Sequence, residues 1–158
     1  MNRALDAVFG GWQMGGIVTA TTGRPFNVGL QNTAPYAGAP AWPIRVADGR
    51  LGEDPFLWFD PNAFRAPAIT ERNGLGLFGN SARGVLYSPG VLNIDFHTMK
   101  TFKITEKVNF QFRFEAFNLT NTPFFGFPNT AIGSPTAGRI TSTIGDNRSL
   151  QFSGRISF

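Results

Sequence analysis

The chain has 158 residues, 14% of them aromatic and only 15% charged, with 19 glycines and 11 prolines, which predicts a β-rich protein with long loops. Its formal net charge of +4 comes from basic residues spread along the chain, which argues against the clustered basic patch of a nucleic-acid-binding protein. Cysteine is absent, so disulfides and thiolate metal sites are excluded, and no stretch of about 18 apolar residues predicts a transmembrane helix.

The first predicted strand covers about residues 10–22, with Trp12, Met14 and Val18 on one face, and Gly15 and Gly16 weaken it. The following stretch, about residues 23–89, carries frequent proline and glycine and little periodic signal. It is predicted to be a long loop with short helical turns at 54–59 and 60–64. A loop of this length is uncommon inside a compact soluble domain and is typical of a scaffold whose loops extend outward.

Two further strands, joined by a very short turn, are predicted at about 91–103 and 108–118. Apolar and polar residues alternate along both, and successive side chains of a strand point to opposite faces, so each strand has one apolar and one polar face. A second long loop is predicted at about 120–147, into which residues 138–144 extend a strand. The final strand, about 149–158, alternates in the same way and ends on Phe158.

The connections therefore alternate between long and very short, and the strands have the length that crosses a membrane when tilted. This is the layout of an outer-membrane barrel, with short periplasmic turns, long outer loops, apolar residues towards lipid and polar residues towards the lumen. The predicted fold is all-β: an antiparallel meander of about four long strands, an open part of a transmembrane β-barrel with long extracellular loops. A soluble sheet with one face on a core shares the pattern and remains an alternative.

The barrel interpretation assigns a side to each alternating residue. The lipid-facing set is Leu92, Ile94, Phe96, Val108, Phe110, Phe112, Phe114, Phe152 and Ile156. The lumen-facing polar row is Asn93, Asp95, His97, Asn109, Gln111, Arg113 and Glu115. Antiparallel pairing is expected to bring Asp95 and His97 close to Arg113 and Glu115, where opposite charges pair across strands. Lys100 interrupts the apolar face and is expected near the membrane boundary.

No motif predicts catalysis, a cofactor or a metal. The G-x-G-x-x-G at residues 74–79 has neither a strand before it nor a helix after it, so it does not predict a dinucleotide site. The chain has one histidine, His97, and no motif supports a catalytic triad or a zinc site around it. Asp95 and His97 share a strand face, but a polar row is the better interpretation than a metal pair. The protein is not expected to be an enzyme.

Several segments, in this order, resemble the C-terminal end of TonB-dependent receptors, and most closely the Oar-like receptors with a carboxypeptidase-regulatory-like N-terminal domain. The segments are Gly-Gly-Trp-Gln-Met-Gly-Gly-Ile-Val-Thr (10–19), Thr-Gly-Arg-Pro-Phe (22–26), Phe-Asp-Pro-Asn-Ala-Phe (59–64), Phe-Gly-Asn-Ser-Ala-Arg (78–83), Lys-Thr-Phe-Lys-Ile-Thr (100–105), Phe-Gln-Phe-Arg-Phe-Glu-Ala-Phe-Asn-Leu-Thr-Asn (110–121), Gly-Arg-Ile-Thr (138–141) and Gln-Phe-Ser-Gly-Arg-Ile-Ser-Phe (151–158). Ala137 departs from the family, which often has an aromatic residue there.

The resemblance implies that the chain is part of a longer receptor in the cell outer membrane, with a signal peptide, a plug and a barrel of about 22 strands. It implies four partners: outer-membrane lipid, the remainder of the barrel and plug, the outer-membrane assembly machinery, and the TonB complex, reached through an N-terminal region outside this sequence. It also implies that Phe158 resembles the signal read by the assembly machinery. The expected role is barrel wall, lumen lining and outward substrate-contacting loops. The alternative is a soluble β-sandwich module that binds a carbohydrate or a protein.

Overall fold

A computed structural model describes residues 8–31, 42–67 and 79–158. The chain divides into two compact units. The sheet unit is formed by Met1–Thr21, Val91–Pro123 and Gly145–Phe158, and the loop unit by Thr22–Gly90 and Phe124–Ile144. Residues 74–78 of the G-x-G-x-x-G lie outside the described residues. No helix in the described ranges is long and apolar enough to cross a membrane.

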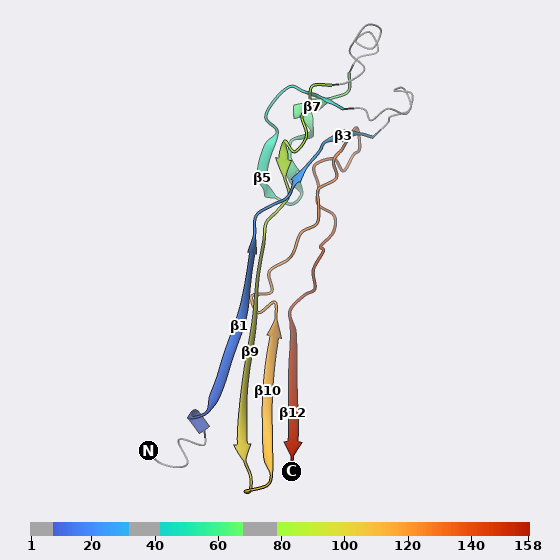
Figure 1. The fold of residues 1–158 in the computed structure, drawn as a ribbon. Helices are drawn as coiled ribbons and strands as arrows, with labels where there is room; N and C mark the ends of the chain where they lie inside the picture. The colour runs from blue at the N-terminus through green and yellow to red at the C-terminus, as the bar shows by residue number, and fades with distance from the viewer. Residues whose placement is uncertain (1–7, 32–41, 68–78) are drawn as a thin grey trace. The chain divides into compact units, whose positions relative to one another are not determined.

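The described part of the sheet unit is built on one four-stranded antiparallel sheet with the strand order β1-β9-β10-β12 (Figure 1). Its strands are β1 (Trp12–Thr21), β9 (Val91–Lys103), β10 (Asn109–Phe117) and β12 (Ser149–Ser157). Each strand pairs with the long strand that precedes or follows it in the chain, so the antiparallel meander expected from the sequence is confirmed. Both long connections leave the sheet at one end, because Thr21 pairs with Val91 and Phe117 with Ser149.

The short turn between β9 and β10 is closed at the other end of the sheet by its own hydrogen bonds. The backbone N–H groups of Ile104 and Thr105 donate to the carbonyl of Val108 at 2.9 and 3.1 Å. The Thr105 hydroxyl oxygen accepts from the N–H of Val108 at 3.1 Å, as threonine commonly does in turns. Val108 therefore belongs to the turn, and β10 begins one residue later than the sequence suggested.

Two glycines expected to weaken β1 lie where a side chain would collide with β9, with the flexible His97 ring at Gly15 and with the backbone at Gly16. Gly15 pairs with His97, and a Cβ on Gly15 would meet His97 Cε1 at 2.6 Å. A Cβ on Gly16 would meet the backbone oxygen of Asp95 at 2.7 Å. A glycine in a strand offers no side chain for packing, which weakens the strand. The structure shows that the missing side chains leave room for β9.

The loop unit contains short strands and a 3₁₀ turn, η2 (Pro61–Ala63). The strands are β2 (Pro25–Phe26), β3 (Gly29–Leu30), β4 (Ile44–Arg45), β5 (Arg50–Asp54), β6 (Leu57–Phe59), β7 (Phe64–Arg65), β8 (Leu86–Tyr87) and β11 (Ala131–Ile132). They form two-stranded pairs, β2 with β8, β3 with β11, β4 with β7 and β5 with β6. The helical turn expected at 60–64 is present as η2, whose N-cap Asp60 accepts from the N–H of Asn62 at 2.9 Å.

Two expectations for this region are wrong. Residues 54–59 do not form a helical turn but the tip and second arm of the β5–β6 hairpin, where Asp54 Oδ1 accepts from the N–H of Phe56. Residues 138–144 form no strand; their one ladder contact is an isolated bridge between Phe125 and Thr143. The backbone groups there bond instead to turns and loops, as in the bond from Ile140 N to Pro55 O at 2.8 Å.

The predicted long loops also close around a hydrophobic core. Its buried members are Phe26, Val28, Phe59, Ala63, Phe64, Val85 and Leu86. Phe59 is fully buried, and its ring lies 6.0 Å from those of Phe26 and Phe64. The register of β2 with β8 places Phe26 opposite Leu86, which ties the two ends of the first long segment together. The loop unit is thus a small folded body with its own core.

Candidate functional site

The register of the sheet puts its large apolar side chains on one face. Phe110 lies opposite Phe102 on one side and Ile156 on the other, and Phe114 lies opposite Thr98 and Phe152. The rings of Phe114 and Phe152 are 5.0 Å apart. The residues of this face, called the apolar face, are Trp12, Met14, Gly16, Val18, Ala20, Leu92, Ile94, Phe96, Thr98, Lys100, Phe102, Phe110, Phe112, Phe114, Ala116, Leu150, Phe152, Gly154 and Ile156.

The opposite face, called the polar face, carries most of the ionisable groups of the sheet. Glu115 lies opposite His97, as expected, and its carboxylate accepts from Arg113 Nη2 at 2.6 Å along the same strand. Asp95 does not join this pair, because Met99 is the residue opposite Arg113. The Asp95 carboxylate instead accepts from the N–H of Asn118 at 2.9 Å and from Asn93 Nδ2 at 3.0 Å, so it fixes the end of β10.

The structure therefore places the sequence-predicted residues on two opposite faces of one sheet. Among the predicted lipid-facing residues, all but Val108 lie in the four strands and on the apolar face. The predicted polar row lies on the other face, and three of its members, His97, Arg113 and Glu115, are close neighbours. Phe158 follows the last residue of β12 and is fully exposed.

The sheet has no buried hydrophobic core of its own in the residues that the structure describes. Its buried side chains are those of Lys100, Ala116 and Asn118. On the edge strand β12, Phe152 is 66% exposed and Ile156 is 62% exposed. A soluble sandwich would bury such rings between two sheets. The described sheet unit contains no second sheet to do so, and a large exposed apolar surface marks contact with lipid or another protein.

Lys100 is the one charged side chain on the apolar face, and it is 4% exposed. Its ammonium nitrogen donates to the carbonyl of Val8 at 3.2 Å and lies 5.4 Å from the ring centre of Trp12 and 5.1 Å from that of Phe102. Cation–π contacts of this kind are stronger away from water. The side chain is thus enclosed by aromatic rings close to the short-turn end of the sheet.

The loop unit carries a hollow of about 210 Å³ that no sequence pattern indicated. Its lining includes the buried core residues Phe59 and Leu86 and the less buried Trp58 and Tyr87. Trp58 is held in place because its indole N–H donates to the carbonyl of Tyr87 at 2.7 Å. The charged residue of the lining is Arg50, at the start of β5.

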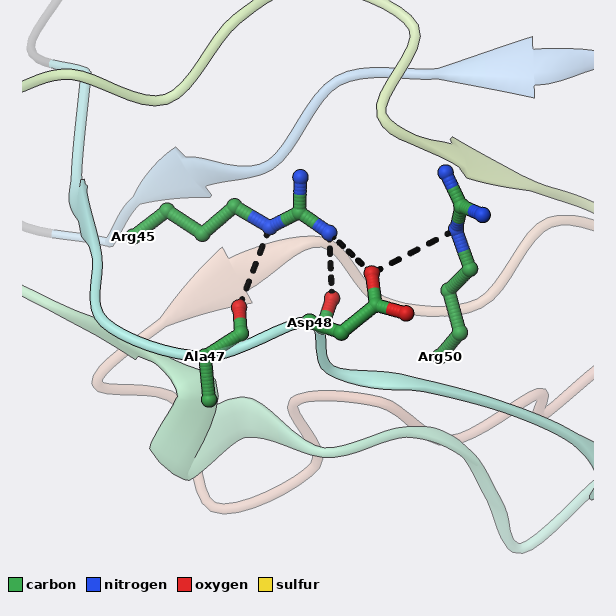
Figure 2. A network of polar contacts seen from close by, with 4 residues as sticks. All are labelled: Arg45, Ala47, Asp48 and Arg50. Carbon is green, nitrogen blue, oxygen red and sulfur yellow. Dashed lines mark hydrogen bonds and ion pairs between the residues drawn. The ribbon is translucent and has the colours of Figure 1, made fainter.

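Figure 2 shows that two arginines, Arg45 and Arg50, contact one carboxylate, that of Asp48. Arg50 belongs to the lining of this hollow. Arg45 donates to the backbone carbonyls of Ala47 and Asp48 at 3.0 and 2.7 Å, and it also bonds to the Asp48 carboxylate. Arg50 reaches the same carboxylate oxygen through Nε at 3.5 Å, and its two terminal nitrogens carry no contact in Figure 2. The cluster holds two positive charges and one negative charge.

A second, more open hollow of about 620 Å³ lies elsewhere on the loop unit. It is lined by Phe56, Phe125, Arg139 and a row of residues with hydroxyl groups, among them Thr141 and Ser142. Within the described ranges, no group of three or more histidine, cysteine, aspartate or glutamate side chains is close enough to hold a metal ion.

A single antiparallel sheet with an uncovered aromatic face, a polar opposite face and long connections at one end is the wall of a membrane β-barrel. The family comparison agrees with this class: residues 1–151 match the outer membrane beta barrel domain. The chain belongs to this family and is a barrel segment of an outer-membrane protein. Neither the curated proteins nor the solved structures gave a match.

Proposed function

We propose that this barrel segment is part of a TonB-dependent receptor of the Oar-like type, which takes up a substrate across the outer membrane. In this proposal the apolar face contacts lipid, the polar face lines the lumen, and the loop unit contacts substrate outside the cell. The observation that supports the barrel-wall part of the proposal is the register of the sheet, which separates aromatic from ionisable side chains while leaving both faces without a covering core in the described sheet unit. The receptor type rests on the resemblance of the sequence segments to TonB-dependent receptors.

The separation of the two faces fits a barrel wall better than a soluble module. In lipid every backbone polar group has to be paired within the protein, and only helices and closed barrels achieve this. The outer edges of β1 and β12 each lack a strand in the described sheet, so closure requires further strands there. A wall segment of a larger barrel satisfies this requirement, because neighbouring strands would pair with both edges.

The orientation can be tested with a matched pair of positions on β10. Because the chain contains no cysteine, Gln111→Cys and Phe112→Cys each introduce one thiol at nearly the same depth but on opposite faces. An environment-sensitive fluorophore attached to position 112 should be quenched by a spin-labelled lipid, and the same fluorophore at position 111 should be quenched by aqueous iodide. Equal quenching of the two positions by lipid would contradict the proposed orientation.

The receptor role needs a separate test in cells. Uptake of a substrate through a TonB-dependent receptor should stop when the TonB gene is deleted, and passive diffusion through a pore should continue. The outer-membrane protein containing this chain should therefore lose uptake, but not surface binding, in the deletion strain. Uptake that is unchanged in that strain would show a barrel without TonB coupling.

A further inference from the structure

We infer that the hollow beside Arg50 binds a small carboxylate with an apolar or aromatic body. This inference rests on the proposed function in taking the loop unit as the part of the protein that meets the substrate. It adds the chemical class of ligand, which follows from the residues that line the hollow and from the hydrogen-bonding state of Arg50.

The walls of the hollow favour an apolar ligand body. The lining includes Trp58, Tyr87 and Leu51 together with buried core residues, and the indole N–H of Trp58 is already bonded within the protein. The rings of Trp58 and Tyr87 therefore offer a stacking surface, and the indole N–H of Trp58 needs no hydrogen bond from a ligand. Small-ligand sites are commonly lined by apolar and aromatic side chains with a few polar groups that fix orientation.

The charge of the hollow favours an anionic head group. Arg45 uses its guanidinium on two backbone carbonyls and on Asp48, so it serves the fold of the 45–48 turn (Figure 2). Arg50 makes one ion-pair contact, from Nε to the Asp48 carboxylate at 3.5 Å, and its terminal nitrogens have no partner among the described residues. The three side chains of Arg45, Asp48 and Arg50 have a net charge of one positive unit, which favours an anionic ligand.

The geometry of the guanidinium selects a carboxylate. Arginine presents parallel N–H donors that match the two oxygens of a planar carboxylate, and such paired charged hydrogen bonds are about twice as strong as neutral ones. Asp48 contacts Nε of Arg50 at 3.5 Å and leaves both terminal nitrogens available to a ligand. A carboxylate attached to a ring would bond to Arg50 while its ring lies against Trp58 and Tyr87.

The test uses 3-phenylpropionate as the probe and the 158-residue chain refolded in detergent micelles. In a background with Trp12→Phe and Trp42→Phe, Trp58 is the remaining tryptophan of the three, and its fluorescence reports directly on the hollow. The expected result is saturable binding of 3-phenylpropionate and at least about 10-fold weaker binding of 3-phenylpropanol and 3-phenylpropylamine, because a hydrogen bond to a charged group contributes about 1.5–3 kcal/mol.

Variants locate the site. Arg50→Gln should weaken binding by at least about 10-fold, and Arg50→Lys, which keeps the charge but loses the paired donors, should fall between it and the unmodified chain. Arg139→Gln is the matched control, because it makes the same charge change in the other hollow and should leave binding unchanged. Near-ultraviolet circular dichroism checks that each variant keeps a folded loop unit.

Four results would overturn the inference: no binding of the carboxylate, equal binding of the alcohol, tighter binding of 3-phenylpropyl phosphate, or loss of binding in Arg139→Gln in place of Arg50→Gln. The lipid-quenching experiment on positions 111 and 112 tests the barrel wall independently of ligand binding. If the chain binds the carboxylate but position 112 is not quenched by lipid, the binding site is retained and the membrane wall is rejected. If position 112 is quenched but the carboxylate does not bind, the membrane wall is retained and the binding site is rejected.

Discussion

Replacing Val18 by arginine tests whether the apolar face of the sheet meets lipid. Val18 lies on the apolar face opposite Ile94, and its neighbour Thr19 lies on the polar face opposite Asn93. Val18 is 67% exposed, and Thr19 is exposed as well. In water both substitutions are therefore expected to change the free energy of unfolding by no more than about 0.5 kcal/mol. In a bilayer the two positions should differ strongly.

The expected difference follows from the position of Val18 along its strand. β1 has 10 residues, and Val18 lies between one and two residues from its middle. At about 3.3 Å per residue and a tilt of about 40°, this places the side chain about 4 Å from the midplane of the hydrocarbon layer. An arginine facing lipid near the midplane costs about 2–4 kcal/mol, and one facing the lumen costs little. Val18→Arg should therefore lower stability by about 2–4 kcal/mol relative to Thr19→Arg.

The measurement is a urea titration of the outer-membrane protein that contains this chain, reconstituted in phospholipid vesicles and followed by tryptophan fluorescence. Val18→Leu serves as a control, because it keeps an apolar side chain at the same depth and should unfold close to the unmodified protein. If Val18→Arg and Thr19→Arg unfold at the same urea concentration, the apolar face does not contact lipid. A loss of stability confined to Thr19→Arg would reverse the assignment of the two faces.

Three further outcomes are expected. Phe59→Ala should destabilise the loop unit by about 3–5 kcal/mol, measured by near-ultraviolet circular dichroism during chemical unfolding, because it empties a fully buried ring site; a change below about 1 kcal/mol would contradict the core. Lys100→Glu should be less stable than Lys100→Met by about 2 kcal/mol or more in the vesicle titration, because it sets a carboxylate against two ring faces and the carbonyl of Val8; equal stability would argue against the aromatic enclosure. Without lipid or detergent the chain should self-associate in sedimentation velocity, because the outer edges of β1 and β12 are open in the described sheet; a monodisperse monomer would contradict this.

The long strands could be predicted from the sequence because each of them repeats its pattern over many residues. β9 occupies the predicted range of 91–103, and β10 and β12 begin within one residue of expectation. A period of two residues, sustained over about nine or more positions, is typical of a strand with two unlike faces and does not fit the 3.6-residue period of a helix. The start of β10 was misplaced at Val108 because the role of the Thr105 hydroxyl in closing the turn leaves no periodic signal.

The loop unit could not be predicted in the same way because its strands are two to five residues long. Phe26, Val28 and Leu30 do alternate, and this was the available signal, but three positions beside a proline and a glycine are a weak pattern. The core forms when Phe26 meets Leu86, 60 positions away, and closure at that distance is a tertiary event. The hollow beside Arg50 depends on the same closure, because Trp58 comes from the β5–β6 hairpin and Tyr87 from β8, which pairs with the distant β2.

The two units differ in how much buried apolar surface offsets the conformational entropy lost on folding. This difference argues for a membrane environment. The loop unit buries seven apolar side chains in one cluster, and each large one contributes roughly 1.5–3 kcal/mol when removed from water. The described sheet unit has only Ala116 as a buried apolar residue, although its apolar face carries six phenylalanine and tryptophan rings on β9, β10 and β1 and a further ring on β12. A sheet with so little buried surface does not offset its own conformational entropy in water. In the proposed barrel wall, hydrocarbon would supply the missing contact for the rings, and adjoining barrel strands would supply the missing hydrogen bonds for the edges. The same sequence therefore folds one part against itself and leaves the other to be completed by its surroundings.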